Sequence, residues 1–412
     1  MDGCHSDHVT DRGGYGPKHL GSTSRPSFAR PTLVLAAVGL AVGGFAFMGP
    51  GDDDLATTAP PADGGSDAPV EDLDVCVRAS LEDRVGLVLV VGIPGVTTID
   101  HPLVDDLVEA GVAGVMLRDD NIEDADQVEA LIDGLRERLG EDLLVAVDDE
   151  GGRVTSMGAL DGPIRSARRL GQGEPDDARA FGRELGEVAA SVGIDWVFAP
   201  VADLDDGPAG GVIGDRSFGA DPTVTAEAAR AVAAGLRDAG VAATAKHFPG
   251  HGGDGDPHSG QTIDATTPDE LAADLLPFRG LIDDGVAATM VGHVTYPALW
   301  GDTPASLAPG AYELLRNEGF DGVAITDALG MGAVHARYGF DVAPAMAIAA
   351  GADVALVNQG DQVLVLRDGL VAAVQDGRLD EARLDDAVRH VLALRGQSPD
   401  GVVCDRPSAI GT

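Results

Sequence analysis

The chain has 412 residues and is strongly acidic, because 68 Asp and Glu outnumber 28 Lys and Arg and give a formal net charge of -40. Only 4% of its residues are aromatic, and Lys18 and Lys246 are its only lysines. Proteins that bind nucleic acid need basic clusters for the phosphates and often aromatic side chains for the bases. The composition therefore excludes nucleic acid as a partner. The length admits two average domains or one α/β barrel of about 250 residues or more.

The N-terminal part has the pattern of an export signal or a membrane tether. Residues 1–31 are polar and include Arg25 and Arg30, and an uncharged apolar run follows over residues 32–48. This run has about the minimum length of a spanning helix and is slightly long for the core of a signal peptide. The arginines before it, and the acidic residues 52–54 after it, orient the following chain outward. We expect a cytoplasmic tail, then a transmembrane anchor or cleaved signal segment, and an extracellular or cell-surface location for the rest.

The chain beyond this run divides into a linker and one folded domain. Residues 49–72 are rich in Pro, Ala, Gly and Asp, a composition typical of a flexible linker. The folded domain is expected over residues 73–405. Cys76 and Cys404 lie at its two ends, and such a pair in an exported protein often forms a disulfide. We therefore predict a Cys76–Cys404 disulfide, with two unpaired thiols as the alternative.

Short apolar runs alternate with amphipathic segments along the folded domain. The runs show little polar alternation, which is typical of strands buried on both faces, as in a parallel sheet. They cover residues 85–92, 113–118, 143–148, 196–203, 243–247, 288–293, 322–327 and 354–358. Predicted helices between them include residues 125–139, 178–192, 224–239 and 268–283. Eight strand–helix units predict an α/β fold, a single (β/α)₈ TIM barrel preceded by the hydrophobic segment and linker. A doubly wound open sheet is the alternative.

Polar residues gather where these strands end. Asp148, Asp203, the Lys246–His247 pair, His293 and Asp327 each lie at the carboxyl end of an apolar run. In a TIM barrel, that end of the strands carries the active site. We therefore expect these side chains to converge on one site.

The segment with the most polar chemistry covers residues 246–258, which begin Lys-His-Phe-Pro-Gly-His-Gly. Its glycines and prolines predict a loop, and a loop with three His and two Asp is suited to function more than to packing. Asp256 lies two residues before His258, a spacing that suits a carboxylate orienting an imidazole for proton transfer. Alternatives are a solvated polar loop, or a metal site built from His247, His251, Asp256 and His258.

Asp327 follows an apolar run directly and precedes small residues, so its carboxylate is expected to be sterically open. A carboxylate that attacks an anomeric carbon needs such access. The alternative is an Asp that caps the next helix. Two further segments carry charged candidates, Asp148 before a Gly-Gly pair and Arg216 within residues 213–219. The first suits hydrogen bonds to sugar hydroxyls, whereas Arg216 could bind substrate or pair with Asp215.

Four motifs together resemble glycoside hydrolase family 3, in its β-N-acetylhexosaminidase branch, over residues 77–394. They occur in the order of that family. They are Asp-x-Glu-Gly-Gly-Arg-Val at 148–154, Ile-Gly-Asp-Arg-Ser-Phe at 213–218, Lys-His-Phe-Pro-Gly-His-Gly at 246–252 and Thr-Asp-Ala-Leu-x-Met at 326–331. The glucosidase branch of the family takes its acid/base from a second domain. Little chain remains here after the eighth strand, which favours the hexosaminidase branch.

The resemblance implies a role for each matched residue. Asp327 matches the catalytic nucleophile, His258 the acid/base of this branch, and Asp256 the carboxylate paired with that histidine. The residues that match the grip on the non-reducing sugar are Asp148, Arg216, Lys246 and His247. The chain departs from the family pattern at Ser156, where a sugar-contacting arginine is usual, and at Pro257, where serine is usual. No organic cofactor is implied and no metal is required.

The function expected from these features is that of a retaining, exo-acting β-N-acetylglucosaminidase. Its substrate would be a terminal β-linked N-acetylhexosamine of peptidoglycan fragments or chitooligosaccharides. The nearest alternatives are a phosphorylase of the same glycosides and a β-glucosidase of the same family. A non-catalytic sugar-binding protein at the cell wall is a more remote alternative.

Overall fold

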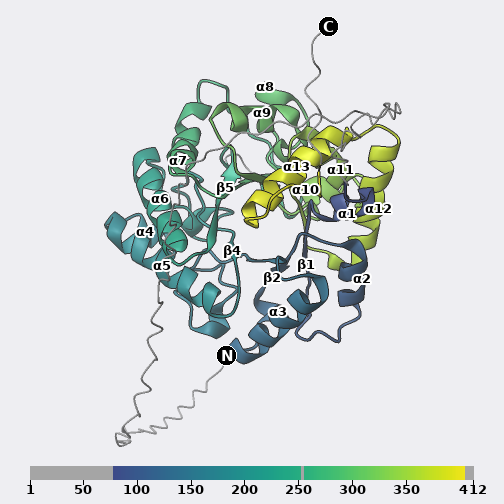
Figure 1. The fold of residues 1–412 in the computed structure, drawn as a ribbon. Coiled ribbons are helices and arrows are strands. Elements are labelled where there is room, and N and C mark those ends of the chain that lie inside the picture. Colours follow the sequence, from purple (N-terminus) through teal and green to yellow (C-terminus); the bar gives the residue numbers. More distant parts are fainter. Residues whose placement is uncertain (1–77, 252–254, 404–412) are drawn as a thin grey trace, which may run out of the picture. The chain divides into compact units, whose positions relative to one another are not determined.

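The computed structural model describes residues 78–251 and 255–403, and these form the predicted barrel (Figure 1). The strands β1 to β7 pair in parallel in chain order, and β8 pairs with β1. A parallel bridge between Ile325 and Val354 links β7 to β8 and closes the ring. The strands are β1 (Leu89–Gly92), β2 (Gly114–Leu117), β3 (Leu144–Val147), β4 (Trp196–Val197), β5 (Ala242–Phe248), β6 (Ala288–Val291), β7 (Val323–Thr326) and β8 (Ala355–Val357). The (β/α)₈ prediction is confirmed.

Helices surround the strands on the outside of the barrel (Figure 1). The longer ones are α2 (Leu103–Ala110), α3 (Ala125–Leu139), α5 (Pro175–Ser191), α6 (Pro222–Asp238), α7 (Leu271–Asp283), α9 (Pro309–Asn317), α11 (Ala343–Ala350), α12 (Val363–Gln375) and α13 (Glu381–Leu394). The shorter helices are α1 (Leu81–Gly86), α4 (Ala167–Leu170), α8 (Pro297–Trp300) and α10 (Gly332–His335).

Helix starts follow local sequence signals. Asp124, Asp221 and Asp380 each accept a hydrogen bond from a backbone amide of the first turn, which satisfies a donor that has no partner within the helix. Pro175 and Pro222 stand near the starts of α5 and α6, where the missing amide hydrogen costs nothing. These signals define where the helices begin. The loops between the strand ends and these helix starts are therefore available to carry site residues.

The core has two layers. Inside the barrel lie side chains such as Met116, Trp196, Phe198, Met290 and Leu356, and the Trp196 indole donates a hydrogen bond of 2.7 Å to Thr244. The larger layer packs between the strands and the surrounding helices. Strand β5 is buried except at its first residue, and the other seven strands are buried along their whole length. This explains why the strands are apolar without alternation.

The first predicted strand was wrong in its first half. Residues 85–92 were expected to be extended, but Val85 belongs to α1, and β1 begins at Leu89. The Ser80 side chain accepts a hydrogen bond from the Asp83 amide and starts this turn. Buried Arg84 then reaches Asp385 on α13 at 2.6 Å. An apolar run alone does not distinguish a buried helical turn from a buried strand.

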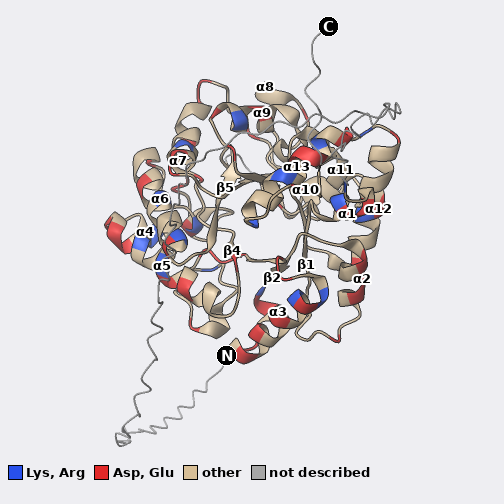
Figure 2. Cartoon of the chain, viewed as in Figure 1, with Lys and Arg blue, Asp and Glu red and all other residues tan. Residues whose placement is uncertain are grey.

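The predicted tail, apolar segment, linker and both cysteines of the proposed disulfide lie outside the described residues. The domain boundaries at 73 and 405 also fall there, so these remain predictions. Within the part of the chain that the structure describes, no helix is long and apolar enough to cross a membrane. Acidic residues are spread over the outer helices, including α2, α3 and α5 (Figure 2).

Candidate active site

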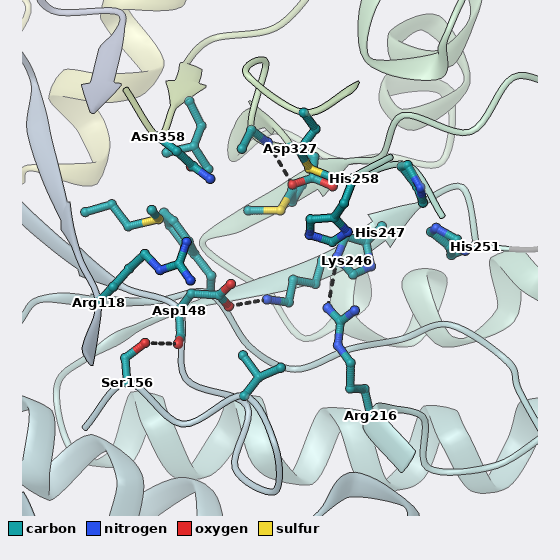
Figure 3. A pocket seen from close by; sticks show the side chains of 18 of the residues that line it. Arg118, Asp148, Ser156, Arg216, Lys246, His247, His251, His258, Asp327 and Asn358 are labelled. Carbon is teal, nitrogen blue, oxygen red and sulfur yellow. Dashed lines mark hydrogen bonds and ion pairs between the residues drawn. The ribbon is translucent and has the colours of Figure 1, made fainter. Parts of the chain in front are cut away.

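A pocket of about 330 Å³ lies at the carboxyl ends of the strands (Figure 3). Six of the seven predicted site residues line it, namely Asp148, Arg216, Lys246, His247, His258 and Asp327. The seventh, Asp256, hydrogen-bonds one of them. The structure therefore brings together residues that are up to 179 positions apart, from Asp148 to Asp327.

Asp327 follows β7 directly and is held by backbone contacts. Its amide donates to Val291 O at 2.9 Å, and its Oδ1 accepts from the Ala328 amide at 2.7 Å. Burial alone would raise the pKa of Asp327, but the hydrogen bond from the Ala328 amide and the positive charge of Lys246 lower it below its ordinary value. Helix α10 begins later and has Met331 at its N-cap, so Asp327 is not a helix cap.

His293, which follows β6, supports the turn that carries Asp327. Its Nε2 lies 2.9 Å from Ala328 O, and since a carbonyl only accepts, Nε2 carries the proton. Its Nδ1 then accepts from the Ser306 hydroxyl at 2.7 Å. Burial lowers the pKa of His293 and favours this neutral form. The sequence placed His293 at a strand end but gave it no role.

Lys246 lies on β5 and pairs with two carboxylates after β3. Its Nζ is 2.6 Å from Asp148 Oδ1 and 2.6 Å from Glu150 Oε1. The lysine is buried, and although burial alone would lower its pKa, Asp148 and Glu150 raise it. Lys246 is therefore an ammonium with a fixed direction inside the pocket.

Glu150 also holds Arg216, through two hydrogen bonds of 2.7 Å each. Burial would raise the pKa of Glu150, but the charges of Lys246 and Arg216 bring it below its ordinary value. Glu150 thus fixes both Lys246 and Arg216, two of the cations that line the pocket. Sequence reasoning placed it in a motif but did not select it, because its position between two cations depends on the folded barrel. The alternative in which Arg216 pairs with Asp215 is not seen, since Asp215 pairs with Arg153 at 3.3 Å.

His247 is oriented by Asp203, the residue at the end of the fourth predicted run. Asp203 accepts from the His247 amide at 3.0 Å and lies 2.7 Å from its Nδ1. The carboxylate accepts, so Nδ1 carries the proton and Nε2 is an acceptor, which faces Arg216 at 3.5 Å (Figure 3). Alternate residues of a regular strand point to opposite faces, but the β5–β6 register shifts after Lys246. Both Lys246 and His247 line the pocket.

His258 and Asp256 form the predicted pair at the open side of the pocket. Asp256 Oδ1 lies 2.8 Å from His258 Nδ1 and accepts the His258 amide at 2.9 Å. Slight burial raises the pKa of Asp256, but these hydrogen bonds from His258 lower it overall. The carbonyls of Pro257 and His258 accept from the first amides of α10, at 3.0 and 3.2 Å. Pro257 therefore does not prevent the pairing.

Two other features of the site concern the predicted departures and alternatives. The Ser156 hydroxyl donates to the Asp148 carbonyl at 2.6 Å and so supports the turn after β3. Among the described residues, no three His, Cys, Asp or Glu side chains are grouped so as to hold a metal ion.

In this barrel the Asp327 carboxylate at the end of β7 shares a pocket with the His258 imidazole, which Asp256 orients. This arrangement is suited to cleave glycosidic bonds. The protein is a glycoside hydrolase. Residues 80–394 match the model of the glycosyl hydrolase family 3 N-terminal domain, and the chain belongs to that family.

Its relatives agree with this assignment. The chain is 41% identical over 267 residues to β-hexosaminidase LpqI of Mycobacterium tuberculosis, which covers 62% of this chain and 69% of the relative. A family 3 glycosyl hydrolase structure from Mycobacterium smegmatis superposes with a TM-score of 0.70 at 36% identity, covering 77% of this chain and 98% of that one. A family 3 β-N-acetylglucosaminidase from Paenibacillus gives a TM-score of 0.73 at 33% identity, over 81% and 66%.

Proposed function

We propose that the protein is a retaining, exo-acting β-N-acetylglucosaminidase with Asp327 as nucleophile. The observation that carries the proposal is the ionised Asp327 carboxylate, which lines the same pocket as the Asp256-oriented imidazole of His258. The named β-hexosaminidase and β-N-acetylglucosaminidase among its relatives support the choice of sugar.

The reaction has two displacements. In the first, a carboxylate oxygen of Asp327 bonds to the anomeric carbon while the bond from that carbon to the leaving oxygen breaks. His258 gives its proton to the leaving oxygen and is left neutral. In the second, His258 removes a proton from water, the hydroxide bonds to the anomeric carbon, and the bond to Asp327 breaks. Two inversions give net retention.

An imidazole suits this pocket for an electrostatic reason. Asp327 lies in a site that already holds the carboxylates Asp148, Glu150 and Asp203. A further carboxylate as acid/base would add repulsion toward the nucleophile, whereas His258 is cationic or neutral. The carboxylate of Asp256 fixes the orientation of the ring.

The grip on the terminal sugar is assigned to residues after β3, on β5 and in the connection between β4 and α6. Asp148 and His247 Nε2 accept hydroxyl protons, and Lys246 and Arg216 donate to hydroxyl oxygens. Both cations are held in place by Glu150 before the sugar arrives, so little reorganisation is needed on binding. We propose peptidoglycan fragments or chitooligosaccharides as substrates, encountered outside the cell or at its surface.

The decisive experiment uses the full chain with two substrates, an aryl β-N-acetylglucosaminide and a β-linked N-acetylglucosamine disaccharide. We expect Asp327→Ala to abolish turnover of both substrates. Loss of a general acid costs about 10²–10⁴-fold, and the loss in His258→Ala should be larger for the disaccharide, whose leaving group needs the proton more. Exposed His101, outside the pocket, provides the control variant His101→Ala.

The products define the reaction. Nuclear magnetic resonance of the first product should show the β-anomer, as retention requires. The α-anomer would contradict a covalent intermediate, and full activity of Asp327→Ala would refute the assigned nucleophile. Turnover only in the presence of phosphate would make the protein a phosphorylase, and sugar binding without turnover would leave a binding protein.

A further inference from the structure

The candidate pocket has a wall to which no role has been assigned. Arg118, Asp119 and Asn358 line both this pocket and an adjoining one of about 270 Å³. The adjoining pocket is bounded by the carboxyl ends of β1, β2 and β8. Protein atoms therefore do not fill the space behind this wall, and its side chains face open volume on two sides.

The backbone of Arg118 is held by hydrogen bonds, whereas its guanidinium has no partner among the described residues. Its amide donates to Asn121 Oδ1 at 2.8 Å, and buried Asn121 donates in turn to Ile93 O at 2.7 Å and Val96 O at 3.0 Å. Its guanidinium is exposed and makes no hydrogen bond or ion pair within residues 78–251 and 255–403. Figure 3 shows it directed into the pocket, toward Asp148.

Asn358 contributes an acceptor without a donor. Its Oδ1 is buried and has no hydrogen-bond partner among the described residues. Its backbone is fixed against β1, because a Cβ at Gly92 would lie 2.9 Å from Asn358 O. A buried polar atom without a partner is costly, so a ligand that donates a hydrogen bond here is favoured.

The order of the strands tells which part of a sugar this wall faces. In the ring of eight strands, β3 is four places from β7, so Asp148 lies across the barrel from Asp327. Arg118 follows β2, the neighbour of β3. When the anomeric carbon C1 is at Asp327, the opposite ring carbon, C4, faces Asp148 and Arg118. The hydroxymethyl carbon C6 is attached beside C4, at C5.

The other flank of the sugar is defined in the same way. Asn358 follows β8, which lies between β7 and β1, whereas Lys246 and His247 belong to β5. The two sets of side chains thus approach the ring from different sides. One oxygen of Asp148 is already engaged by Lys246. Hydroxyl groups at the far end of the sugar therefore still need a donor, and Arg118 supplies one.

We propose that Arg118 and Asn358 are substrate-binding residues that contact the hydroxyl groups on C4 and C6 of the terminal sugar. The Arg118 guanidinium donates to a hydroxyl oxygen, and Asn358 Oδ1 accepts a hydroxyl proton. This inference rests on the proposed function, because it takes Asp327 as the position of C1. It makes the wall a determinant of which terminal sugar is accepted.

The test pairs protein variants with substrates that lack single hydroxyl groups. Aryl β-N-acetylglucosaminide and its 4-deoxy and 6-deoxy analogues are compared with full-length wild type, Arg118→Gln and Asn358→Leu. With the complete sugar, we expect Arg118→Gln to lower kcat/KM about 10-fold or more, as for a hydrogen bond to a charged group. We expect about fivefold for Asn358→Leu, whose neutral hydrogen bond is weaker. Arg138→Gln, on α3 and paired with Asp105, removes the same charge elsewhere.

The pairing of losses separates binding from structure. If Arg118 contacts a hydroxyl, its loss should shrink to about threefold or less with the analogue that lacks that hydroxyl, as in a double-mutant cycle. Coupling to either the 4-deoxy or the 6-deoxy sugar supports the proposal. Equal losses with all three sugars, or no loss in either variant, would overturn it. Wild type inactive on every aryl glycoside would instead refute the proposed function itself.

Discussion

Three consecutive acids after β3, Asp148, Asp149 and Glu150, have three different environments. Asp148 is 37% exposed and bonds Lys246, whereas Glu150 is buried between two cations. Asp149 is buried without a cation. Its two oxygens accept backbone amides of Gly151 at 3.1 Å and Met157 at 2.8 Å. Burial outweighs these hydrogen bonds and raises the pKa of Asp149 to about 6.

This raised pKa predicts a specific effect of pH on stability. Between about pH 4 and 6, the folded protein holds a proton on Asp149 that the unfolded chain releases, so stability from this group is lost as pH rises. The shift corresponds to about 3 kcal/mol. In Asp149→Asn, the free energy of unfolding at pH 7 minus that at pH 4 should therefore be more positive than in wild type, by up to about 3 kcal/mol. Urea denaturation at the two pH values measures it.

Asp206→Asn provides the control, because Asp206 is an exposed carboxyl in another loop. It should leave the difference between pH 7 and pH 4 as in wild type. The same difference in Asp149→Asn and in wild type would show that Asp149 does not hold its proton in the folded state.

For single residues, the sequence predicted which side chains suit the reaction better than it predicted which side chains pair with each other. Asp327, Lys246 and the Asp256–His258 pair stand out because their residue types and neighbours suit glycoside cleavage. Glu150 does not stand out in this way, because it pairs with Lys246 only when the ends of β3 and β5 lie close together in the fold. Arg118 was visible only as the last residue of an apolar run. Arg118 matters because its guanidinium is unpaired within the described part of the chain and faces a pocket. That pocket exists only once the ends of β1 and β8 come together in the fold.

The long connection between β4 and α6 carries Arg216 and is held by Arg168. Arg168 Nη2 donates to Asp205 O at 2.7 Å and to Gly214 O at 2.6 Å. The Asp205 side chain in turn accepts the Gly214 amide at 2.6 Å. These bonds close the connection on itself just before Arg216. Arg168 lies outside the pocket and is therefore a positioning residue.

Removing this clamp should affect binding more than chemistry. We expect Arg168→Ala to raise KM about tenfold, because charge-assisted hydrogen bonds that hold the Arg216 loop are lost. Since Asp327 and His258 lie on other elements, kcat should stay within about threefold. Steady-state kinetics on the aryl glycoside measures both constants.

The neighbouring Arg169→Ala serves as the control, since Arg169 is exposed and lies in the same short helix α4. Its kinetics should match those of wild type. A fall in kcat as large as the fall in kcat/KM in Arg168→Ala would contradict a role limited to placing Arg216.

Element boundaries were predictable where local signals agree. The helix predicted over residues 125–139 has those bounds, because Asp124 caps it and Gly140 ends it. The run 196–203 was predicted as one strand, but only Trp196 and Val197 are extended in the ladder. Beyond them, the chain still runs beside β5, with the carbonyls of Ala199 and Pro200 accepting β5 amides and a bridge between Val201 and Lys246, but it forms no regular strand. Phe198 lines the pocket in this segment, and an apolar pattern does not reveal whether a strand ladder continues.

At the scale of the whole molecule, an ionic cluster holds the end of the barrel opposite the pocket. Asp353 precedes β8 and is fully buried, with Arg316 at 2.6 Å and Arg383 at 2.6 Å. His390 lies 3.1 Å away, and the Ala324 amide of β7 donates at 2.9 Å. These bonds cross the junction between β7 and β8, where one bridge links the strands.

The cluster predicts a large effect on stability and a small one on catalysis. Asp353→Asn should lower the free energy of unfolding by about 3–5 kcal/mol, because it leaves two arginines with no shared carboxylate. Asp386, an exposed partner of Arg383, gives the control Asp386→Asn, expected to cost less than about 1 kcal/mol. Urea denaturation compares the two. Equal small losses would show that Asp353 is dispensable, and kcat/KM of the folded Asp353 variant should equal that of wild type.

The alternation of charge from Asp148 through Lys246 and Glu150 to Arg216 restricts how such a site can change over generations. Replacement of Glu150 alone leaves two buried cations facing each other, and replacement of Lys246 alone leaves two carboxylates. We therefore expect these positions to change in compensating pairs. Replacement of Asp148, at the solvent end of the series, still leaves Lys246 paired with Glu150, but it would alter the proposed contact with the sugar. Related enzymes with a new sugar preference should differ first there and at Arg118, with the interior of the series inherited intact.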